Sequence, residues 1–338
     1  MFRKILRAAG VASCFLVTVF SLNATVFAQS EKGFFIVRRG DKVGFINRSG
    51  DLVIPMEFED ALEFSEGLAP AKLDDLWGFI NETGQMVISP TYYQAYEFSD
   101  GLACVKSKNG KYGYIDSLGK LVIPYLSGKA GAFLHGLAPI SVQIGNSRFQ
   151  ETYIRPDGNF LLSPSFDLAG PFTEGLAFVQ KGKYWGVINL NGEYVVTPKY
   201  DEVGEFSEGL APVRIRNRWF YIDKNGKLVP GQGFDHASDF SEGLAAVKVK
   251  RKYGFINKDM KLAIKPIFDD ALFFSEGLAG VKIGEKWAFI DSRGDVKISA
   301  QFDYVEFFDG GLVRVGVGKS TMSFRYINKT GTVVWSDK

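Results

Sequence analysis

The most regular feature of the sequence is a short alternation of apolar and other residues that recurs along most of the chain. In the segment Leu244–Lys250, for example, Val247 and Val249 alternate with Lys248 and Lys250. Alternation with a period of two is typical of a β-strand that buries one face. No segment has a helical period long enough to matter. The pattern therefore predicts an all-β protein.

The alternating segments follow a six-residue signature, Phe-Ser-Glu-Gly-Leu-Ala, which repeats at a nearly constant interval. Most successive copies lie 34 residues apart, and the longest interval is 39 residues. A fixed period of this length indicates a tandem-repeat architecture. The signature is complete at Phe64, Phe206, Phe240 and Phe274 and varied at Phe98, Phe133, Phe172 and Phe308, and a truncated first copy starts near residue 33.

Each copy also carries a turn signal at the end of its second alternating segment. The signal is Asn or Asp followed by Gly three residues later. The Asx side chain can bond its own backbone, and Gly accepts a positive φ, so the pair predicts a hairpin turn. It occurs at Asn47, Asn81, Asp116, Asn189, Asp223, Asp291 and Asn328, whereas two copies have Arg155-Pro-Asp-Gly158 or Met260 in place of the Gly.

A third short segment follows the turn, as at Leu52–Pro55 and Leu121–Pro124. Proline marks the end of this segment because it lacks the N–H that a further ladder bond needs. An aromatic-acidic pair such as Phe58-Glu59 or Phe268-Asp269 then links the segment to the next copy. Each copy is therefore expected to form a three-stranded unit of about 34 residues.

One such unit cannot bury its apolar face alone, so neighbouring copies must stack. We therefore expect residues 29–338 to form a single array of about nine units, either open like a β-solenoid or closed like a β-propeller. Every copy begins with its first strand and ends with its third, so no exchanged strand would fasten the ends of a ring. On this ground we favour the open array, with propeller-like closure as the alternative.

The second segment of several copies carries an aromatic residue followed by Gly, a dyad found at Trp77-Gly78, Tyr112-Gly113, Trp185-Gly186 and Tyr253-Gly254 and eroded at Trp219-Phe220 and Trp287-Ala288. Together with the turn and the signature, these dyads make the chain similar to the bacterial WG repeat proteins, also called KWG repeats. The resemblance covers nearly all of residues 29–338 and implies an often exported protein that mediates binding or interaction. The fourth copy, residues 133–171, departs from the family because it is longer and has no dyad, and the ninth reads Ser323-Phe324-Arg325-Tyr326.

The first 28 residues have the features of a cleavable export signal. A basic start is followed by an apolar stretch from Ala8 to Phe20, and small residues at Val26 and Ala28 precede a cut at Gln29. A retained membrane anchor is an alternative, although the apolar run is short for a span of about 20 residues. Lipidation at Cys14 is another. We expect a periplasmic or extracellular protein with no transmembrane span in the mature chain.

The balance of charge excludes one class of partner. The chain has 40 Lys plus Arg and 38 Asp plus Glu. This leaves no electrostatic footprint for nucleic acid or for an anionic membrane surface.

The sequence contains no constellation that indicates catalysis. Most carboxylates sit at recurrent positions of the repeat, such as those of Glu66 and Glu208, whereas a glycosidase needs one particular pair. The two histidines, His135 and His236, have no metal-ligand spacing, and Cys104, the remaining cysteine after the signal, is expected to be a packing thiol. We therefore expect no enzyme, no metal and no cofactor.

One set of side chains could bind a ligand. Aromatic residues at one position of successive copies would project as a ladder along the array, and exposed rings could stack on sugars. The other interpretation, which we prefer, is that these rings form the core between copies. The ladder consists of Trp77, Tyr112, Trp185, Trp219, Tyr253 and Trp287.

Repetition without a unique polar cluster, together with an export signal, suggests a non-enzymatic binding or protein-interaction scaffold. The alternative is a peptidoglycan- or polysaccharide-binding protein that uses the aromatic ladder. The expected partner is accordingly a protein or a cell-envelope glycan. The irregular copy at residues 133–171 is the preferred place for a unique site, and the oligomeric state stays open.

Overall fold

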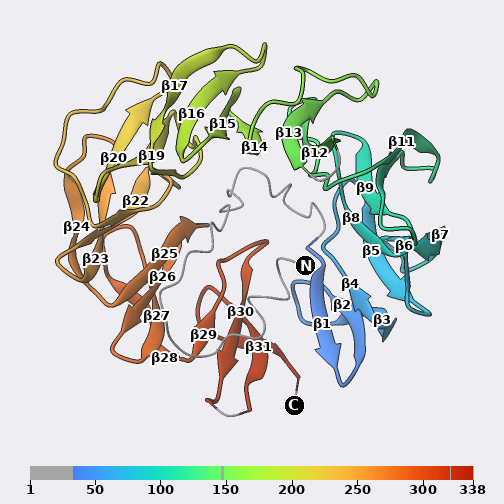
Figure 1. Cartoon of the computed structure of the whole chain (residues 1–338). Helices are drawn as coiled ribbons and strands as arrows, with labels where there is room; N and C mark the ends of the chain where they lie inside the picture. The colour runs from blue at the N-terminus through green and yellow to red at the C-terminus, as the bar shows by residue number, and fades with distance from the viewer. Residues whose placement is uncertain (1–32, 146–147, 320, 338) are drawn as a thin grey trace.

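The computed structural model describes residues 33–145, 148–319 and 321–337. This part of the chain contains no helix, and its strands form nine antiparallel sheets, which we number 1 to 9 in chain order. The sheets are arranged in a ring, and the first sheet (blue) lies beside the last (red) (Figure 1). The all-β tandem-repeat fold expected from the sequence is therefore confirmed.

The strands follow one another without interruption within each sheet. Sheets 1 to 3 contain β1 (Phe35–Arg39), β2 (Lys42–Ile46), β3 (Leu52–Phe58); β4 (Asp60–Ala61), β5 (Leu68–Leu73), β6 (Leu76–Asn81), β7 (Met86–Tyr92); and β8 (Gln94–Ser99), β9 (Leu102–Lys106), β10 (Tyr112–Ile115), β11 (Leu121–Leu126). Sheets 4 to 6 contain β12 (Ala138–Ile144), β13 (Arg148–Ile154); β14 (Leu168–Thr173), β15 (Leu176–Lys181), β16 (Tyr184–Asn189), β17 (Tyr194–Tyr200); and β18 (Glu202–Val203), β19 (Leu210–Ile215), β20 (Arg218–Asp223). Sheets 7 to 9 contain β21 (His236–Ala237), β22 (Leu244–Val249), β23 (Lys252–Asn257), β24 (Leu262–Phe268); β25 (Asp270–Ser275), β26 (Leu278–Ile283), β27 (Lys286–Ile290), β28 (Val296–Phe302); and β29 (Tyr304–Val305), β30 (Leu312–Val317), β31 (Ser323–Asn328), β32 (Val333–Ser336).

Most sheets have one strand more than the three that the repeat predicts. The extra strand has two residues in some sheets and six in others, and it follows directly after the link. In sheet 2 it is β4, where Asp60 lies opposite Lys72 of β5. The acid of the link also fastens the next hairpin: the Asp269 carboxylate accepts a hydrogen bond from the Gly284 N–H at 2.9 Å. The link is therefore part of the following sheet and is not a free loop between two sheets.

The glycine of each dyad permits a close approach between the second and third long strands. A Cβ on Gly78 would lie 2.3 Å from the Ile88 carbonyl oxygen, and one on Gly254 would lie 2.5 Å from that of Ile264. The strand register shifts at the same place, between Trp77 and Phe79 in sheet 2. Glycine is therefore required here by an irregularity of the strand pairing.

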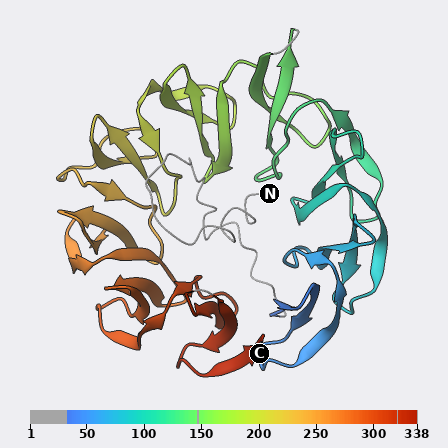
Figure 2. The same cartoon turned by 60° about the horizontal axis from the view of Figure 1, so that its bottom comes forward.

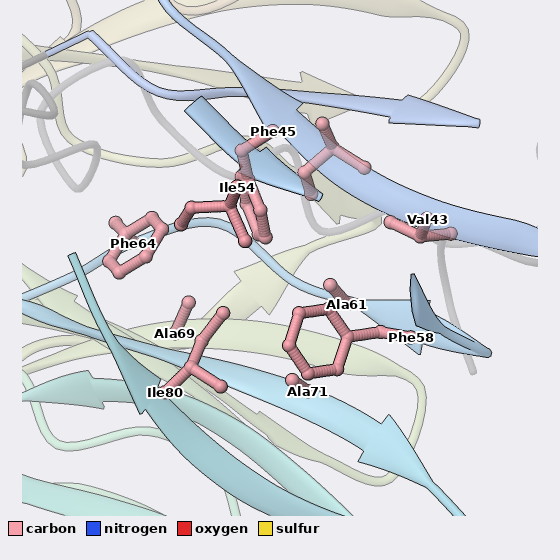
Figure 3. Packing of buried hydrophobic residues seen from close by; sticks show 10 residues of the cluster. Val43, Phe45, Ile54, Phe58, Ala61, Phe64, Ala69, Ala71 and Ile80 are labelled. Carbon is pink, nitrogen blue, oxygen red and sulfur yellow. The ribbon is translucent and has the colours of Figure 1, made fainter. Parts of the chain in front are cut away.

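The core lies between adjacent sheets. Figure 3 shows Phe45 and Ile54 of sheet 1 facing Phe64 and Ile80 of the next copy. The same pairing of a second-strand aromatic with the next signature phenylalanine recurs around the ring, as for Phe255 and Phe274, whose ring centroids lie 4.9 Å apart. Burial of each such ring stabilises the fold by roughly 1.5–3 kcal/mol. Each sheet is therefore completed by its neighbour.

The polar residues of the signature also connect neighbouring sheets. The Ser207 hydroxyl donates a hydrogen bond of 2.7 Å to the carbonyl oxygen of Phe240, one copy later. The Glu208 carboxylate accepts a hydrogen bond from the Gly243 N–H at 3.1 Å, and Lys258 pairs with the same carboxylate at 2.9 Å. Glu208 has a positive φ of 54°, which the turn imposes. The recurrent acids therefore fasten one copy to the next.

The ring is closed, so the preference for an open array was wrong. Phe35 and Ile46 of sheet 1 share a buried cluster with Leu312 and Tyr326 of sheet 9. A Cβ on Gly50 would lie 2.1 Å from the Val334 carbonyl oxygen, which repeats the contact of each Asx-turn glycine with the preceding sheet. Closure occurs without an exchanged strand, because side-chain contacts join the first and last sheets. The nine sheets therefore adopt the propeller-like alternative (Figure 2).

Sheet 6 is irregular because a large side chain stands where most copies have the dyad glycine, and a glycine stands in the segment opposite it. Phe220 stands where other copies have the dyad glycine, and the segment opposite it makes only isolated bridges, at Leu228 and Phe234. That segment contains Gly233, where a Cβ would lie 2.8 Å from the Phe220 ring. Phe220 therefore takes the space that the third strand occupies in regular sheets.

Candidate functional site

The structure places the six ladder residues between the sheets. Trp77 and Trp185 are buried, with 9% and 3% of their surface exposed, and the other four are half-buried. The rings belong to or pack against successive hydrophobic clusters rather than lining one open groove. His236 lies between two of them, with centroid distances of 5.7 Å to Trp219 and 5.9 Å to Tyr253. Burial lowers the pKa of His236.

Two other residues noted in the sequence have clear structural positions. His135 is exposed at the signature position that an acid occupies in most copies, and its φ is 55°. Cys104 is buried, and burial raises the pKa of its thiol to about 12. Among the described residues, no group of three His, Cys, Asp or Glu side chains could hold a metal ion. That part of the chain also has no helix capable of crossing a membrane.

The array departs most from its regular form in the fourth copy. Sheet 4 has only two strands, β12 and β13, and the third strand is replaced by a loop that makes isolated bridges at Phe160 and Phe166. The loop turns at Gly158, whose N–H donates to the Arg155 carbonyl at 2.9 Å. Without a full third strand, part of this sheet and of its neighbour is left uncovered.

Apolar side chains are exposed at this place. Phe149 and Phe160 are 48% and 40% exposed, and Ile144 and the neighbouring Tyr125 are each 38% exposed. Beside them lies a pocket of about 430 Å³ that opens to solvent. It is lined by Leu126, Ser127, Ser141, Val142, Gln143, Gly145 and Phe160. We call Tyr125, Ile144, Phe149, Phe160 and this pocket the sheet 4 surface. It wraps around the hairpin of β12 and β13, because the strand register places Phe149 on one face of the hairpin and Ile144 on the other.

A carboxylate replaces the ladder aromatic beside this surface. The register of β12 and β13 pairs Glu151 with Ser141 and Phe149 with Gln143, so these four side chains share one face. The Glu151 carboxylate accepts hydrogen bonds from the Ser141 hydroxyl at 3.0 Å and the Ala169 N–H at 2.5 Å. Burial raises its pKa, which the two hydrogen bonds partly offset.

Sequence reasoning selected the fourth copy but missed Glu151. The signal was present, because aligning Tyr153-Ile154 with Phe255-Ile256 places Glu151 at the position of Tyr253. This carboxylate faces no second acid, and its two oxygens are engaged by Ser141 and by backbone. Its arrangement is that of a structural hydrogen-bond acceptor. The sheet 4 surface therefore offers apolar contacts and a few polar groups, which suit binding.

Several solved structures align with 90% of this chain. The match to a eukaryotic initiation factor has a TM-score of 0.61 at 14% identity and covers 96% of that chain. BamB from Moraxella catarrhalis has a TM-score of 0.42 at 9% identity with 94% of its chain covered. The extracellular domain of a hybrid two-component system from B. thetaiotaomicron has 0.29 at 10%, with 50% covered. The first likeness shows the fold alone. No curated protein matches the chain.

The repeats themselves match a family model. The model for the WG-containing repeat fits eight consecutive segments, at residues 44–77, 77–112, 112–143, 152–185, 185–219, 219–253, 253–287 and 287–319. Most segments run from one dyad position to the next, and the gap at residues 144–151 falls in the irregular sheet 4. The chain therefore belongs to the family of proteins built from WG-containing repeats.

Proposed function

We propose that this protein is an exported, non-enzymatic scaffold that binds a protein partner through the sheet 4 surface. The observation that carries the proposal is the group of exposed apolar side chains around the pocket, in a copy that lacks a full third strand. Exposed apolar clusters with a polar margin are typical of protein interaction sites. Aromatic anchors such as Phe149 and Phe160 supply most of the binding energy in such sites.

Packing of sheet 4 against both neighbouring sheets supports this role because it holds the surface in place. Sheet 4 is held on one side by Tyr114 and Phe133, whose ring centroids lie 4.8 Å apart, and on the other by Tyr153 and Phe172 at 4.7 Å. A rigid surface loses little conformational freedom on binding, which favours affinity. Export rests on the signal predicted at residues 1–28, which lie outside the described residues.

The proposal is tested by site-specific photo-crosslinking in the native host. A photoreactive phenylalanine analogue at position 149 should capture a defined protein, and the same analogue at Ile267, which is 62% exposed on β24, should not. The captured protein should then bind the purified chain, and Phe149→Arg with Phe160→Arg should weaken binding about tenfold or more. Equal capture from both positions, or unchanged binding by the double variant, would refute the sheet 4 surface.

Export is tested separately. The mature protein should begin at Gln29 and be found outside the cytoplasm. A cytoplasmic protein that retains Met1 would refute this part of the proposal and leave the binding surface unaffected.

A further inference from the structure

The tight hairpin turns of sheets 5, 6 and 7 are strongly basic. They contain Lys181-Gly182-Lys183, Arg214-Ile-Arg-Asn-Arg218 and Lys248-Val-Lys-Arg-Lys252, with nine basic residues and no acid. The same hairpin recurs in each sheet, so these turns lie at one face of the ring. Neighbouring turns come within contact distance, as Lys319 and Glu285 of sheets 9 and 8 do at 2.5 Å. We call the three turns the basic rim.

The backbone of the basic rim is strained. Arg216, Lys250 and Arg251 have φ values of 59°, 48° and 78°. The turn position of Arg216 and Lys250 is a glycine in sheets 1, 5 and 8, at Gly40, Gly182 and Gly284. A left-handed conformation costs a residue with a Cβ roughly 1–2 kcal/mol, a cost that glycine avoids. The protein keeps charged side chains where glycine would be more stable, and such strain is typical of functional positions.

The charges of these three side chains are not used within the fold. Among the described residues, no ion pair involves Arg216, Lys250 or Arg251, and all three are exposed. The nearby carboxylates hold the turn backbone instead, since Asp201 accepts from the Arg216 N–H at 2.6 Å and Asp235 from the Lys250 N–H at 2.8 Å.

Sheet 2 provides the contrast. Asp74 and Asp75 are also strained, with φ values of 51° and 63°, but Asp75 pairs with Lys72 at 2.8 Å. There the turn uses its charge internally, so the strain has a structural purpose. The free charges of the basic rim have no equivalent purpose inside the molecule.

We propose that the basic rim binds a linear anionic polysaccharide. Cations repeated on successive sheets form an arc that suits a polymer with regularly spaced anions. A flat anionic membrane fits less well, because it would also contact Asp74, Asp75 and Glu285 at the same face. An acidic protein segment would find few apolar contacts, since Ile215 and Val249 are half-buried. This binding is independent of the sheet 4 surface.

The test measures binding of polygalacturonate, with dextran as the neutral polymer. The purified protein should bind polygalacturonate and not dextran, and added salt should weaken the binding because it screens exposed charges. The triple variant Arg216→Gln, Lys250→Gln and Arg251→Gln should bind about tenfold more weakly. The matched control neutralises three exposed cations in the Asx turns, Lys227→Gln, Lys261→Gln and Arg293→Gln, and should change the affinity less than about twofold.

Other outcomes would overturn the proposal. An equal loss of affinity in both triple variants would show that the polymer is attracted by positive charge in general and does not bind the basic rim. Tighter binding to polyglutamate, or to vesicles containing phosphatidylglycerol, would identify an acidic protein or a membrane as the partner. Absence of binding to polygalacturonate by a folded protein would also refute it. Circular dichroism of each variant establishes that the fold is retained.

Discussion

The Tyr326 hydroxyl donates a hydrogen bond of 2.9 Å to the carbonyl oxygen of Ile36, which lies 290 residues earlier in the chain. The ring of Tyr326 also packs on Phe35, with a centroid distance of 5.6 Å. Within the array, Tyr221 of sheet 6 makes the comparable hydrogen bond to Ser238 of the next copy, at 2.6 Å. The joint between the last and first sheets therefore uses the same kind of contact as the joints between neighbours.

This joint should contribute measurably to stability. Tyr326→Phe removes one buried hydrogen bond and leaves the Ile36 carbonyl without it, so the free energy of unfolding should fall by about 1–2 kcal/mol. Urea denaturation of the variant measures the loss, and Tyr221→Phe is the matched control inside the ring. If Tyr221→Phe lowered the free energy of unfolding and Tyr326→Phe did not, the joint between the first and last sheets would not contribute to stability as predicted.

A double-mutant cycle can test whether Phe220 and Gly233 of sheet 6 depend on each other. Gly233→Ala should destabilise the protein by about 1–3 kcal/mol, because the new Cβ would overlap the Phe220 ring and the Arg218 Cβ. Phe220→Gly should also destabilise, because it removes a half-buried ring. In the double variant the penalty of the alanine should become smaller, because only the overlap with the Arg218 Cβ remains. Strictly additive losses would show that the two positions do not interact.

Glu151 should give stability an unusual dependence on pH. Burial raises its pKa in the folded protein, so the folded state holds the proton more tightly than the unfolded state does. As pH rises through the folded-state pKa, a buried carboxyl must ionise, and its contribution to stability is lost. Glu151→Gln does not titrate, so its stability relative to the natural protein should increase between about pH 4 and pH 7.

An acid with the opposite shift provides the control for this measurement. The hydrogen bond from Lys252 lowers the pKa of Asp269, so its contribution is present at neutral pH and is lost as pH falls through the folded-state pKa. Asp269→Asn should therefore become less stable, relative to the natural protein, as pH rises. The same trend for both variants in urea denaturation would contradict the assignment for Glu151.

The strain at the basic rim should be removable. Arg216→Gly relieves a left-handed backbone and retains the N–H that bonds Asp201, so the melting temperature should rise, by an amount equivalent to about 0.5–1 kcal/mol. The same change should weaken polygalacturonate binding. Asn191→Gly, at an exposed turn residue without positive φ, should not stabilise. A lower melting temperature for Arg216→Gly would show that no strain is stored there.

Much of the fold was predictable because it repeats. The signature, the Asx turn and the dyad each recur with a local physical reason, so nine copies gave consistent evidence for the same strands. Closure was not predictable, because it depends on the angle between successive sheets, which no single copy encodes. The contribution of the first copy to closure was also hard to predict. Phe35 packs on Tyr326, but the signature that precedes the other copies is missing before it.

The candidate surfaces were harder to predict. The missing dyad identified the fourth copy, but the exposure of Phe149 depends on a third strand that fails to form. The basic rim was hidden by the balanced total charge, because acids such as Glu208 and Glu242 lie at the opposite ends of the same strands. The acids that do lie at the rim, Asp201 and Asp235, accept hydrogen bonds from the turn backbone, and the side chains of Arg216 and Lys250 form no ion pair with them.

The absence of an exchanged strand has a consequence for how such a ring changes in size. Every described sheet is one uninterrupted segment of chain, and every strand pairs within its own sheet. Duplication or deletion of a single 34-residue copy would therefore add or remove one complete sheet without altering the strand pairing of any other. The rest of the ring would adjust only the angle between neighbours, so rings with different numbers of sheets are accessible to one repeat by simple unequal exchange within its gene.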